Sequence, residues 1–140
     1  MKIIRVSTPE ERDKAYEVRR AVFVEEQGVP VEVEIDEFED AAEHFVIIDG
    51  DRPVGAARLR LLGDTAKLER ICVLMSHRKY GLGRDMVIAM EEVSKELGAV
   101  RAKLHGQTHA EPFYTKLGYQ PASEIFMEEG IPHLLMVKTY

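Results

Sequence analysis

The sequence predicts a mixed α/β fold in which helices cover the faces of one sheet. Apolar residues change their spacing repeatedly along the chain, from the short runs of strands to the three- and four-residue spacing of helices. The predicted order is strand, helix, a run of strands, helix, strand, helix and two strands. A chain of 140 residues holds one core of ordinary size, so we expect a single domain over residues 1–140.

The first half of the chain begins with a helix flanked by strands. Thr8 is suited to cap this helix, Pro9 suits its first position, and Glu11 completes a capping box. An apolar stripe then continues the helix to about residue 23. Short apolar runs predict strands over residues 2–6, 44–49, 54–62 and 67–74. The acidic segment 25–43 is expected to be loop with a short helix.

The second half contains the longest predicted helix. Its apolar positions 82, 86, 90, 93 and 97 lie on one face, and Gly98 ends it. A short helix is expected over residues 111–117, with Pro112 in its first turn. The remaining strands are predicted over residues 100–105, 120–126 and 134–138.

Composition narrows the class of partner. The chain has 19 Lys and Arg against 25 Asp and Glu, a formal net charge of −6, whereas proteins that bind nucleic-acid phosphates usually have a basic excess. No apolar run approaches the roughly 18 residues that cross a bilayer, and the first residues do not resemble a signal peptide. One Cys excludes an intramolecular disulfide framework. We therefore expect a soluble cytoplasmic protein that binds neither nucleic acid nor membrane.

The loop before the longest helix is the strongest candidate for a binding site. It combines basic side chains with two closely spaced glycines: Arg78, Lys79, Arg84, Gly81 and Gly83. A helix N-terminus presents unpaired N–H groups and the positive end of a dipole, and glycines let an anion approach the backbone. These features predict a phosphate or pyrophosphate cradle. The alternative is an ordinary strand-to-helix turn with solvated cations.

Two common phosphate motifs do not fit this loop. A dinucleotide-binding fingerprint needs a third glycine where Met86 stands. A P-loop needs Lys and then Ser or Thr after its last glycine, but Gly83 is followed by Arg84. The pattern Arg78-x-x-Gly81-x-Gly83 instead resembles the pyrophosphate loop of the GNAT superfamily of N-acetyltransferases.

Further stretches extend this resemblance over nearly the whole chain. Residues 112–119 (PFYTKLGY) resemble the superfamily's last helix and the glycine-aromatic pair that follows it. Residues 22–30 (VFVEEQGVP), 34–36 (EID) and 130–133 (GIPH) resemble the ElaA/YjcF-like branch.

The resemblance implies both a fold and an activity. The implied fold has a mostly antiparallel sheet with a central pair of parallel strands that splay apart, here residues 67–74 and 100–105, and helices on both faces. The implied activity moves an acetyl group from acetyl-CoA to a primary amine of a small molecule or peptide, by direct attack in a ternary complex. The identity of the acceptor stays open, and a homodimer is a family-level expectation.

Acetyl-CoA is the cosubstrate that the resemblance implies, with its pantetheine arm between the splayed strands. Backbone groups of Ile71, Cys72 and Val73 are expected to pair with the pantetheine amides, much as an added strand would. The residues expected at the pyrophosphate are Arg78, Lys79, Tyr80, Gly81, Leu82, Gly83 and Arg84. Gln107 and Tyr114 are also expected to contact the cofactor.

The implied reaction needs a proton acceptor, because an alkylamine has a pKa of about 10 and must lose a proton before it attacks. Glu69 is the candidate base, since alternation along a strand places it on the face of Ile71 and Val73. A structural role in the sheet is the alternative reading of Glu69, and Glu26 and Glu34 are rival bases.

The leaving thiolate needs a proton in turn, and the resemblance implies that Tyr114 supplies it. Phe113 would then point into the core; a purely structural role for Tyr114 is the alternative. An N–H of Cys72 or Val73 is expected to hold the oxyanion. By analogy in position, the acceptor site is expected to contain Phe23, Glu26, Arg58 and Glu124.

Three other readings remain open. The chain could be a non-catalytic module that binds or senses acyl-CoA, or a metal-dependent hydrolase. His105-x-x-x-His109 has the spacing of two zinc ligands on a helix, but Gly106 argues against a continuous helix there, so we expect no metal. Cys72 could carry an acyl group, although a structural role as a small apolar side chain is favoured. His44 and His133 could each line the acceptor pocket, although structural packing is favoured for both.

Overall fold

The computed structural model describes all residues, 1–140. It contains one eight-stranded sheet in the order β1-β2-β3-β4-β5-β8-β6, with β7 paired to β8. The strands are β1 (Lys2–Arg5), β2 (Glu43–Asp49), β3 (Arg52–Leu62), β4 (Thr65–Val73), β5 (Arg101–Gln107), β6 (Gln120–Pro121), β7 (Phe126–Glu128) and β8 (Ile131–Thr139). All paired strands run antiparallel except β4 and β5, which run parallel.

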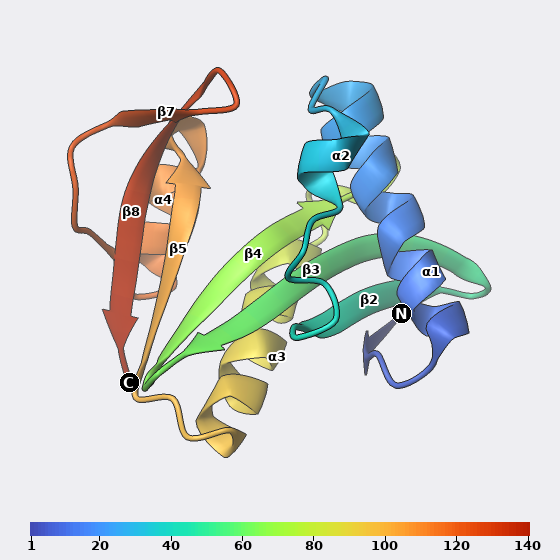
Figure 1. Cartoon of the computed structure of the whole chain (residues 1–140), viewed down its shortest axis with the longest axis horizontal. Helices are drawn as coiled ribbons and strands as arrows, with labels where there is room; N and C mark the ends of the chain where they lie inside the picture. Colours follow the sequence, from blue (N-terminus) through green and yellow to red (C-terminus); the bar gives the residue numbers. More distant parts are fainter.

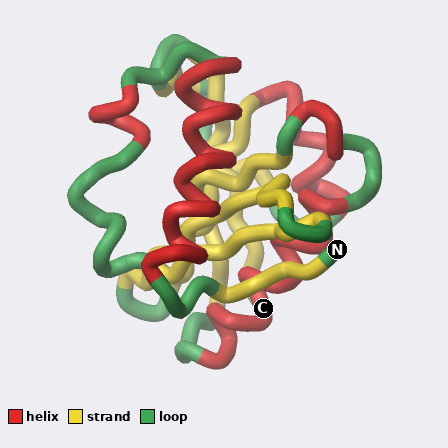
Figure 2. Tube along the Cα trace, turned by 90° about the vertical axis from the view of Figure 1, so that its right-hand side faces the viewer, coloured by secondary structure: helices red, strands yellow, loops and turns green.

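Helices lie on both faces of the sheet, as Figures 1 and 2 show. The α-helices are α1 (Pro9–Arg19), α2 (Val31–Glu34), α3 (Leu82–Glu96) and α4 (Glu111–Lys116). Helix α1 packs on β2 and β3 from one side, whereas α3 packs on β3 and β4 and α4 packs on β5 from the other. The predicted fold class is therefore confirmed. No helix combines the length and apolar character needed to span a bilayer.

The sheet has an apolar core on each face. The larger one, of 18 buried residues, lies under α3 and α4 and includes Met86, Val87 and Met90. The smaller one, of six residues, lies under α1 and includes Ala15, Val18 and Val22. The predicted apolar faces of both long helices are thus the ones that are buried, apart from half-exposed Leu97 at the end of α3.

The first helix starts as predicted but ends differently. The Thr8 hydroxyl accepts a hydrogen bond from the Glu11 N–H at 3.2 Å, and the Glu11 carboxylate accepts one from the Ser7 N–H at 2.8 Å. Beyond Arg19 the helix widens into a π-helical turn, η1 (Arg20–Glu26), which extends past the predicted end near residue 23. Such turns recur at functional sites because they redirect side chains.

The parallel pair β4 and β5 separates along its length. The two strands pair only from Thr65 and Arg101 to Leu68 and Leu104. Beyond this point they diverge, which Figure 1 shows as two ribbons that meet at one end only. The implied splay of the two central strands is confirmed.

A bulge in β4 changes which face its side chains occupy. The register with β3 shifts between Ala56 and Arg58, and Arg70 in β4 has a φ of 59°. Ile71 and Val73 pack against the core under α3, while Glu69 lies among charged side chains on the α1 side. The prediction that Glu69 shares a face with Ile71 and Val73 is therefore wrong, because one extra residue inverts the alternation.

The C-terminal strands also differ from expectation. The predicted strand near 120–126 is two short strands, β6 and β7, and β8 begins at Ile131 rather than near residue 134. The sequence did not predict the true start of β8, because a proline such as Pro132 inside an apolar run argues against a strand. It is tolerated there because it lies at the end of the strand, opposite the short β7.

Candidate active site

A groove of about 460 Å³ lies where β4 and β5 separate. Its walls come from η1 and α2 on one side, β4 and β5 in the middle, and α4 with the β7–β8 hairpin on the other. The groove therefore collects residues that are far apart in the sequence at the one place where the sheet is not closed by hydrogen bonds.

The end of β4 offers free backbone groups to this groove. The N–H of Leu74 bonds to the Val54 carbonyl in β3, so alternation turns the backbone of Cys72 toward β3 as well. The backbone groups of Ile71 and Val73 then face the opening toward β5, where the Val73 carbonyl already accepts a hydrogen bond from Arg78. The expected pantetheine contacts fit Ile71 and Val73 but not the backbone of Cys72, whose N–H is equally unsuited to hold an oxyanion in the groove.

The loop between β4 and α3 has the backbone of an anion cradle. Lys79 and Gly81 have φ values of 77° and 76°, and Gly81 is the residue that precedes the first turn of α3. Left-handed residues alternating with ordinary ones turn successive N–H groups toward one point. A Cβ on Gly83 would lie 3.3 Å from the Phe113 ring, so this glycine lets α4 approach the start of α3. The Lys79, Tyr80 and Arg84 side chains are exposed to solvent beside this loop.

Arg78 does not point at the start of α3. Its Nε donates to the Val73 carbonyl at 3.0 Å, and its terminal nitrogens donate to Glu26 at 2.9 and 2.8 Å. The hydrogen bond from Arg78 lowers the pKa of the Glu26 carboxyl. A residue expected at the phosphates is thus paired with one expected at the acceptor, across the groove.

Tyr114 of α4 lies in the groove beside β5. Its side chain is 9% exposed and packs against Gly106, where a Cβ would come within 3.2 Å of the ring. Burial raises the pKa of Tyr114 to about 12, so the phenol keeps its proton. Its hydroxyl has no hydrogen-bond partner within the protein and is available to a ligand. Phe113 is half-exposed instead of filling the core, which corrects that expectation, because the core position is taken by Tyr114 itself.

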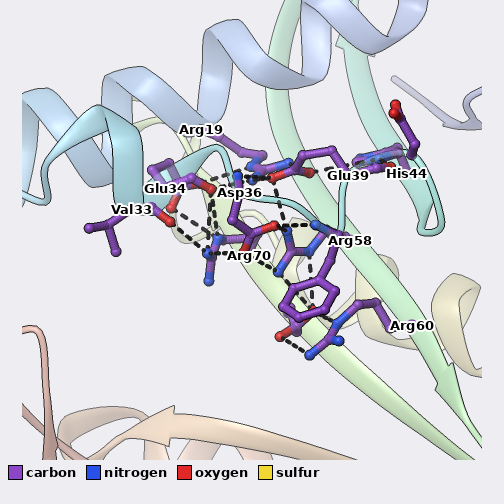
Figure 3. Close-up of polar contacts among 12 residues, drawn as sticks. Arg19, Val33, Glu34, Asp36, Glu39, His44, Arg58, Arg60 and Arg70 are labelled. Atoms are coloured by element: carbon purple, nitrogen blue, oxygen red, sulfur yellow. Dashed lines mark hydrogen bonds and ion pairs between the residues drawn. The ribbon is translucent and has the colours of Figure 1, made fainter.

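Glu69 sits in a dense set of ion pairs, part of which Figure 3 shows. Its carboxylate accepts from Arg58 at 3.1 Å and Arg60 at 2.7 Å and lies 3.2 Å from the Lys67 amine. Burial alone would raise its pKa, but the bond from Arg60 and the charges of Arg58 and Lys67 together lower the pKa of Glu69 to about 2. A carboxylate held in this way accepts a proton poorly. The role of Glu69 as base stays a prediction, and its surroundings weigh against it.

The same network of ion pairs holds the acidic segment 25–43, below called the acidic loop, against the sheet (Figure 3). Arg19 is fully buried and donates to Glu34 and Glu39 at 2.8 Å each, while Arg58 donates to Asp36 at 2.7 Å and to Glu39 at 2.9 Å. Glu34, Asp36 and Glu39, three carboxylates of the acidic segment 25–43, therefore hold this segment against the sheet. Burial raises the pKa of Glu34, whose other oxygen lies 3.0 Å from Arg70.

The expected acceptor residues divide into two groups. Phe23 and Glu26 line the groove, as does Gln107, which donates to the Gln27 side chain at 3.2 Å. Arg58 is 1% exposed inside the ion-pair network, and Glu124 lies exposed in the β6–β7 connection. Neither lines the groove, so the assignment of these two residues to the acceptor site is wrong. Position in the chain could not reveal that Arg58 is used to hold the acidic loop.

Two histidines and a glutamate line the groove although they were not among the predicted site residues: His105, Glu128 and His133. His105 Nδ1 lies 2.8 Å from a Glu128 carboxylate oxygen, and His133 Nδ1 lies 2.7 Å from the Ile131 carbonyl. The Phe126 ring stacks on His133 and meets His105 edge-on. In the sequence, His105 stood out only for its zinc-ligand spacing with His109, and His133 only within the GIPH stretch that starts at Gly130, φ 73°. Nothing in the sequence marked Glu128.

Cys72 and His44, two other residues considered for the site, lie in surroundings that fit a structural role. Cys72 is 7% exposed with its Sγ 3.7 Å from the Ala56 carbonyl, and burial raises its pKa to about 12, which keeps the thiol unreactive. His44 is buried under α1 with Nε2 2.7 Å from the Glu39 carbonyl. No group of three or more His, Cys, Asp or Glu side chains is arranged to hold a metal ion.

Comparison with known proteins assigns this fold and groove to a family. Residues 8–140 match the family model of the acetyltransferase (GNAT) domain. The chain belongs to the GNAT family and is an acetyltransferase of the GNAT type. It is 48% identical to the uncharacterized N-acetyltransferase YjcF of Bacillus subtilis, over 99% of each chain, and 50% identical to the uncharacterized protein YyaT of the same species, over 99% of this chain and 95% of YyaT.

Solved structures agree with this assignment. A Lactobacillus plantarum protein assigned as an N-acetyltransferase superposes with a TM-score of 0.92 at 34% identity, covering 99% of this chain and 97% of that one. Escherichia coli ElaA superposes with a TM-score of 0.86 at 23% identity, over 98% and 97% of the two chains. An aminoglycoside 6'-N-acetyltransferase complexed with coenzyme A has the same fold, with a TM-score of 0.80 at 19% identity over 99% and 97%. The resemblance to the ElaA/YjcF-like branch is confirmed.

Proposed function

We propose that the protein transfers the acetyl group of acetyl-CoA to the primary amine of a small molecule or peptide. One observation carries the proposal: the groove follows the open edge of β4 and is lined by Arg78 and by Tyr114 with its unpartnered hydroxyl. The residues of the anion cradle, 79–84, do not themselves line the groove, but they follow directly after Arg78 in the chain. The coenzyme A in a structure of the same fold supports this reading of the groove.

Acetyl-CoA would bind as an extra strand at the opening. The N–H groups at the start of α3 would hold the pyrophosphate, because they are unpaired and lie at the positive end of the helix dipole. The backbone groups of Ile71 and Val73 would pair with the pantetheine amides, and Gln107 would contact the same arm from β5. For Arg78 to reach a phosphate it must first leave Glu26.

The reaction needs a group that accepts a proton from the amine and a group that donates a proton to the leaving sulfur. The amine attacks the carbonyl carbon, the C–S bond breaks, and the sulfur takes a proton. Tyr114 is the donor in this proposal, since its pKa of about 12 keeps it protonated and its hydroxyl is free.

Two measurements test the proposal. Calorimetry with acetyl-CoA tests the cofactor site, and thiol release in the presence of a panel of amines (spermidine, lysine, glucosamine, an aminoglycoside and hydroxylamine) tests transfer. We expect micromolar binding and thiol release that depends on the amine. Binding without release from any amine would favour the alternative, a non-catalytic acyl-CoA-binding module, and the absence of binding would refute both functions.

A further inference from the structure

We propose that His105, held by Glu128, accepts the proton that the acceptor amine loses. This inference rests on the proposed acetyl transfer and assigns a catalytic residue that the sequence did not single out for it. It is carried by the position of His105 in the sheet, by its hydrogen bond to Glu128, and by the free nitrogen that this bond leaves in the groove.

His105 stands where the two parallel strands part. Leu104 is the last residue of β5 that pairs with β4, so His105 is the first residue beyond the closed end of the opening. Ala102 and Leu104 face the core under α3 and α4, and alternation turns His105 toward the opposite face, where α2 and the acidic loop lie. A thioester whose pyrophosphate sits at the start of α3 would reach this closed end with its acetyl group.

Glu128 fixes which nitrogen of His105 carries the hydrogen. A carboxylate only accepts hydrogen bonds, so the Nδ1 that lies 2.8 Å from Glu128 is the donor. The neutral ring then has its lone pair on Nε2, which has no partner within the protein. The side chain of His105 is 32% exposed, and both residues line the groove. An imidazole oriented by a carboxylate, with its second nitrogen open to a ligand, is a suitable general base.

The hairpin of β7 and β8 holds this pair in place. Phe126 and Glu128 lie on the same face of β7, because side chains alternate, and the Phe126 ring meets the His105 ring edge-on at 5.1 Å. Phe126 also stacks on His133 at 6.0 Å. The imidazole is therefore fixed by one hydrogen bond and one aromatic contact rather than being a mobile surface side chain.

The charged and titratable groups around His105 come from every neighbouring strand. They are Lys67 and Glu69 on β4, Lys103 on β5, Glu128 on β7 with Glu129 beside it, and His133 on β8. The charge of Glu69 is balanced by its ion pairs with Lys67 and Arg60. Glu128 is therefore the charged group that acts most directly on the imidazole of His105. Glu69 lies across the opening but has its carboxylate occupied by three cations.

The step balances with one proton released overall. The ammonium of the acceptor gives a proton to Nε2 of His105, which passes it to solvent. The neutral nitrogen then forms a C–N bond to the thioester carbon, the C–S bond breaks, and the nitrogen loses its second proton by the same route. The sulfur takes one proton from Tyr114, which regains it from solvent. The products are the acetylated amine and coenzyme A.

The kinetic test compares His105→Gln, Glu128→Gln and the control Glu92→Gln with the parent protein, using acetyl-CoA and the fastest amine of the panel. We expect His105→Gln to lower kcat about 100-fold or more, with the affinity for acetyl-CoA within twofold of the parent. Added imidazole should restore part of the rate of His105→Ala.

Glu128 is a positioning residue, and its variant has its own signature. Glu128→Gln should lower kcat about tenfold, because an amide can also donate to Nδ1 and then no longer keeps Nε2 as the free nitrogen. Glu92→Gln is the control, since Glu92 is exposed on α3, lies outside the groove and has no ion pair, and it should leave the rate unchanged.

A second measurement does not need an acceptor. Nitrogen-15 spectra of the histidine-labelled protein should show His105 as the Nδ1–H tautomer, and Glu128→Gln should lower the population of this tautomer. The opposite tautomer, an unaltered tautomer in Glu128→Gln, or unchanged turnover in His105→Gln would each overturn the proposal. Turnover lost in Glu69→Gln but kept in His105→Gln would assign the base to Glu69. Acetyl-CoA binding without turnover in the parent protein would instead refute the proposed function.

Discussion

The guanidinium of Arg78 donates two hydrogen bonds of 2.9 and 2.8 Å to the carboxylate of Glu26, which is 52 residues away in the chain. This ion pair joins the π-helical turn after α1 to the loop before α3 and so spans the groove. It links the wall expected to meet the acceptor with the residues expected to meet coenzyme A.

Glu26→Gln should strengthen coenzyme A binding. The variant frees Arg78 for a phosphate, and because both side chains are partly exposed the pair is worth at most about 1 kcal/mol, or about a fivefold change in affinity. Calorimetric titration measures the effect, with Glu25→Gln, an exposed neighbour, as the control. Unchanged or weaker binding would mean that Arg78 does not move to the cofactor.

Gly81→Glu should abolish coenzyme A binding. The substitution forces a side chain onto a left-handed residue and places a negative charge where the pyrophosphate is expected. Gly63→Glu is the matched control, because Gly63 has a φ of 66° in the β3–β4 turn, far from the start of α3. We expect at least a 100-fold loss of affinity for the first variant only, with similar melting temperatures for both. Equal affinity in the two variants would refute the loop assignment.

Tyr114→Phe should slow turnover without weakening cofactor binding. The hydroxyl is the only atom removed and makes no hydrogen bond within the protein, so the fold should tolerate its loss. We expect kcat to fall about 10- to 100-fold while the Kd for acetyl-CoA stays within about twofold. Since the pKa of Tyr114 is raised to about 12, the parent enzyme should not lose this acid below about pH 11. Undiminished turnover would remove Tyr114 as the proton donor.

Glu69→Gln should destabilise the fold by about 2–4 kcal/mol, because it leaves Arg58 and Arg60 short of a counter-charge in a largely buried place. The folded-state pKa of about 2 lies below the ordinary value of about 4.3, so the stabilisation is complete above about pH 5 and is lost as the pH falls toward 2. Urea unfolding at pH 7 and pH 3 measures both. Glu43→Gln, which breaks an exposed pair with Arg5, should cost less than about 1 kcal/mol. A loss of stability that is the same at both pH values would contradict the ion-pair explanation.

Features set by local spacing were predictable from the sequence. The cap at Thr8, the apolar faces of α1 and α3 and the glycine loop depend on residues close together in the chain, and each forms as expected. The family motifs supplied the splay of β4 and β5, which no periodicity could indicate.

Features set by a single backbone irregularity or by distant pairing were not predictable. The extra residue at Arg70 inverts the faces of β4, and no sequence pattern marks a bulge without glycine. Arg58 was expected in the acceptor site, but it binds Asp36 and Glu39, which come from a distant part of the chain. His105 and Glu128 are 23 residues apart and meet only because the β7–β8 hairpin folds back.

The buried ion pairs of Arg19 and Arg58 separate two properties of the segment between η1 and β2. They hold the segment against the sheet through Glu34, Asp36 and Glu39. Val29 and Val33 of the same segment line the groove and take no part in these ion pairs. A substitution at either valine should therefore change the size or polarity of the groove while the ion pairs that hold the segment stay in place.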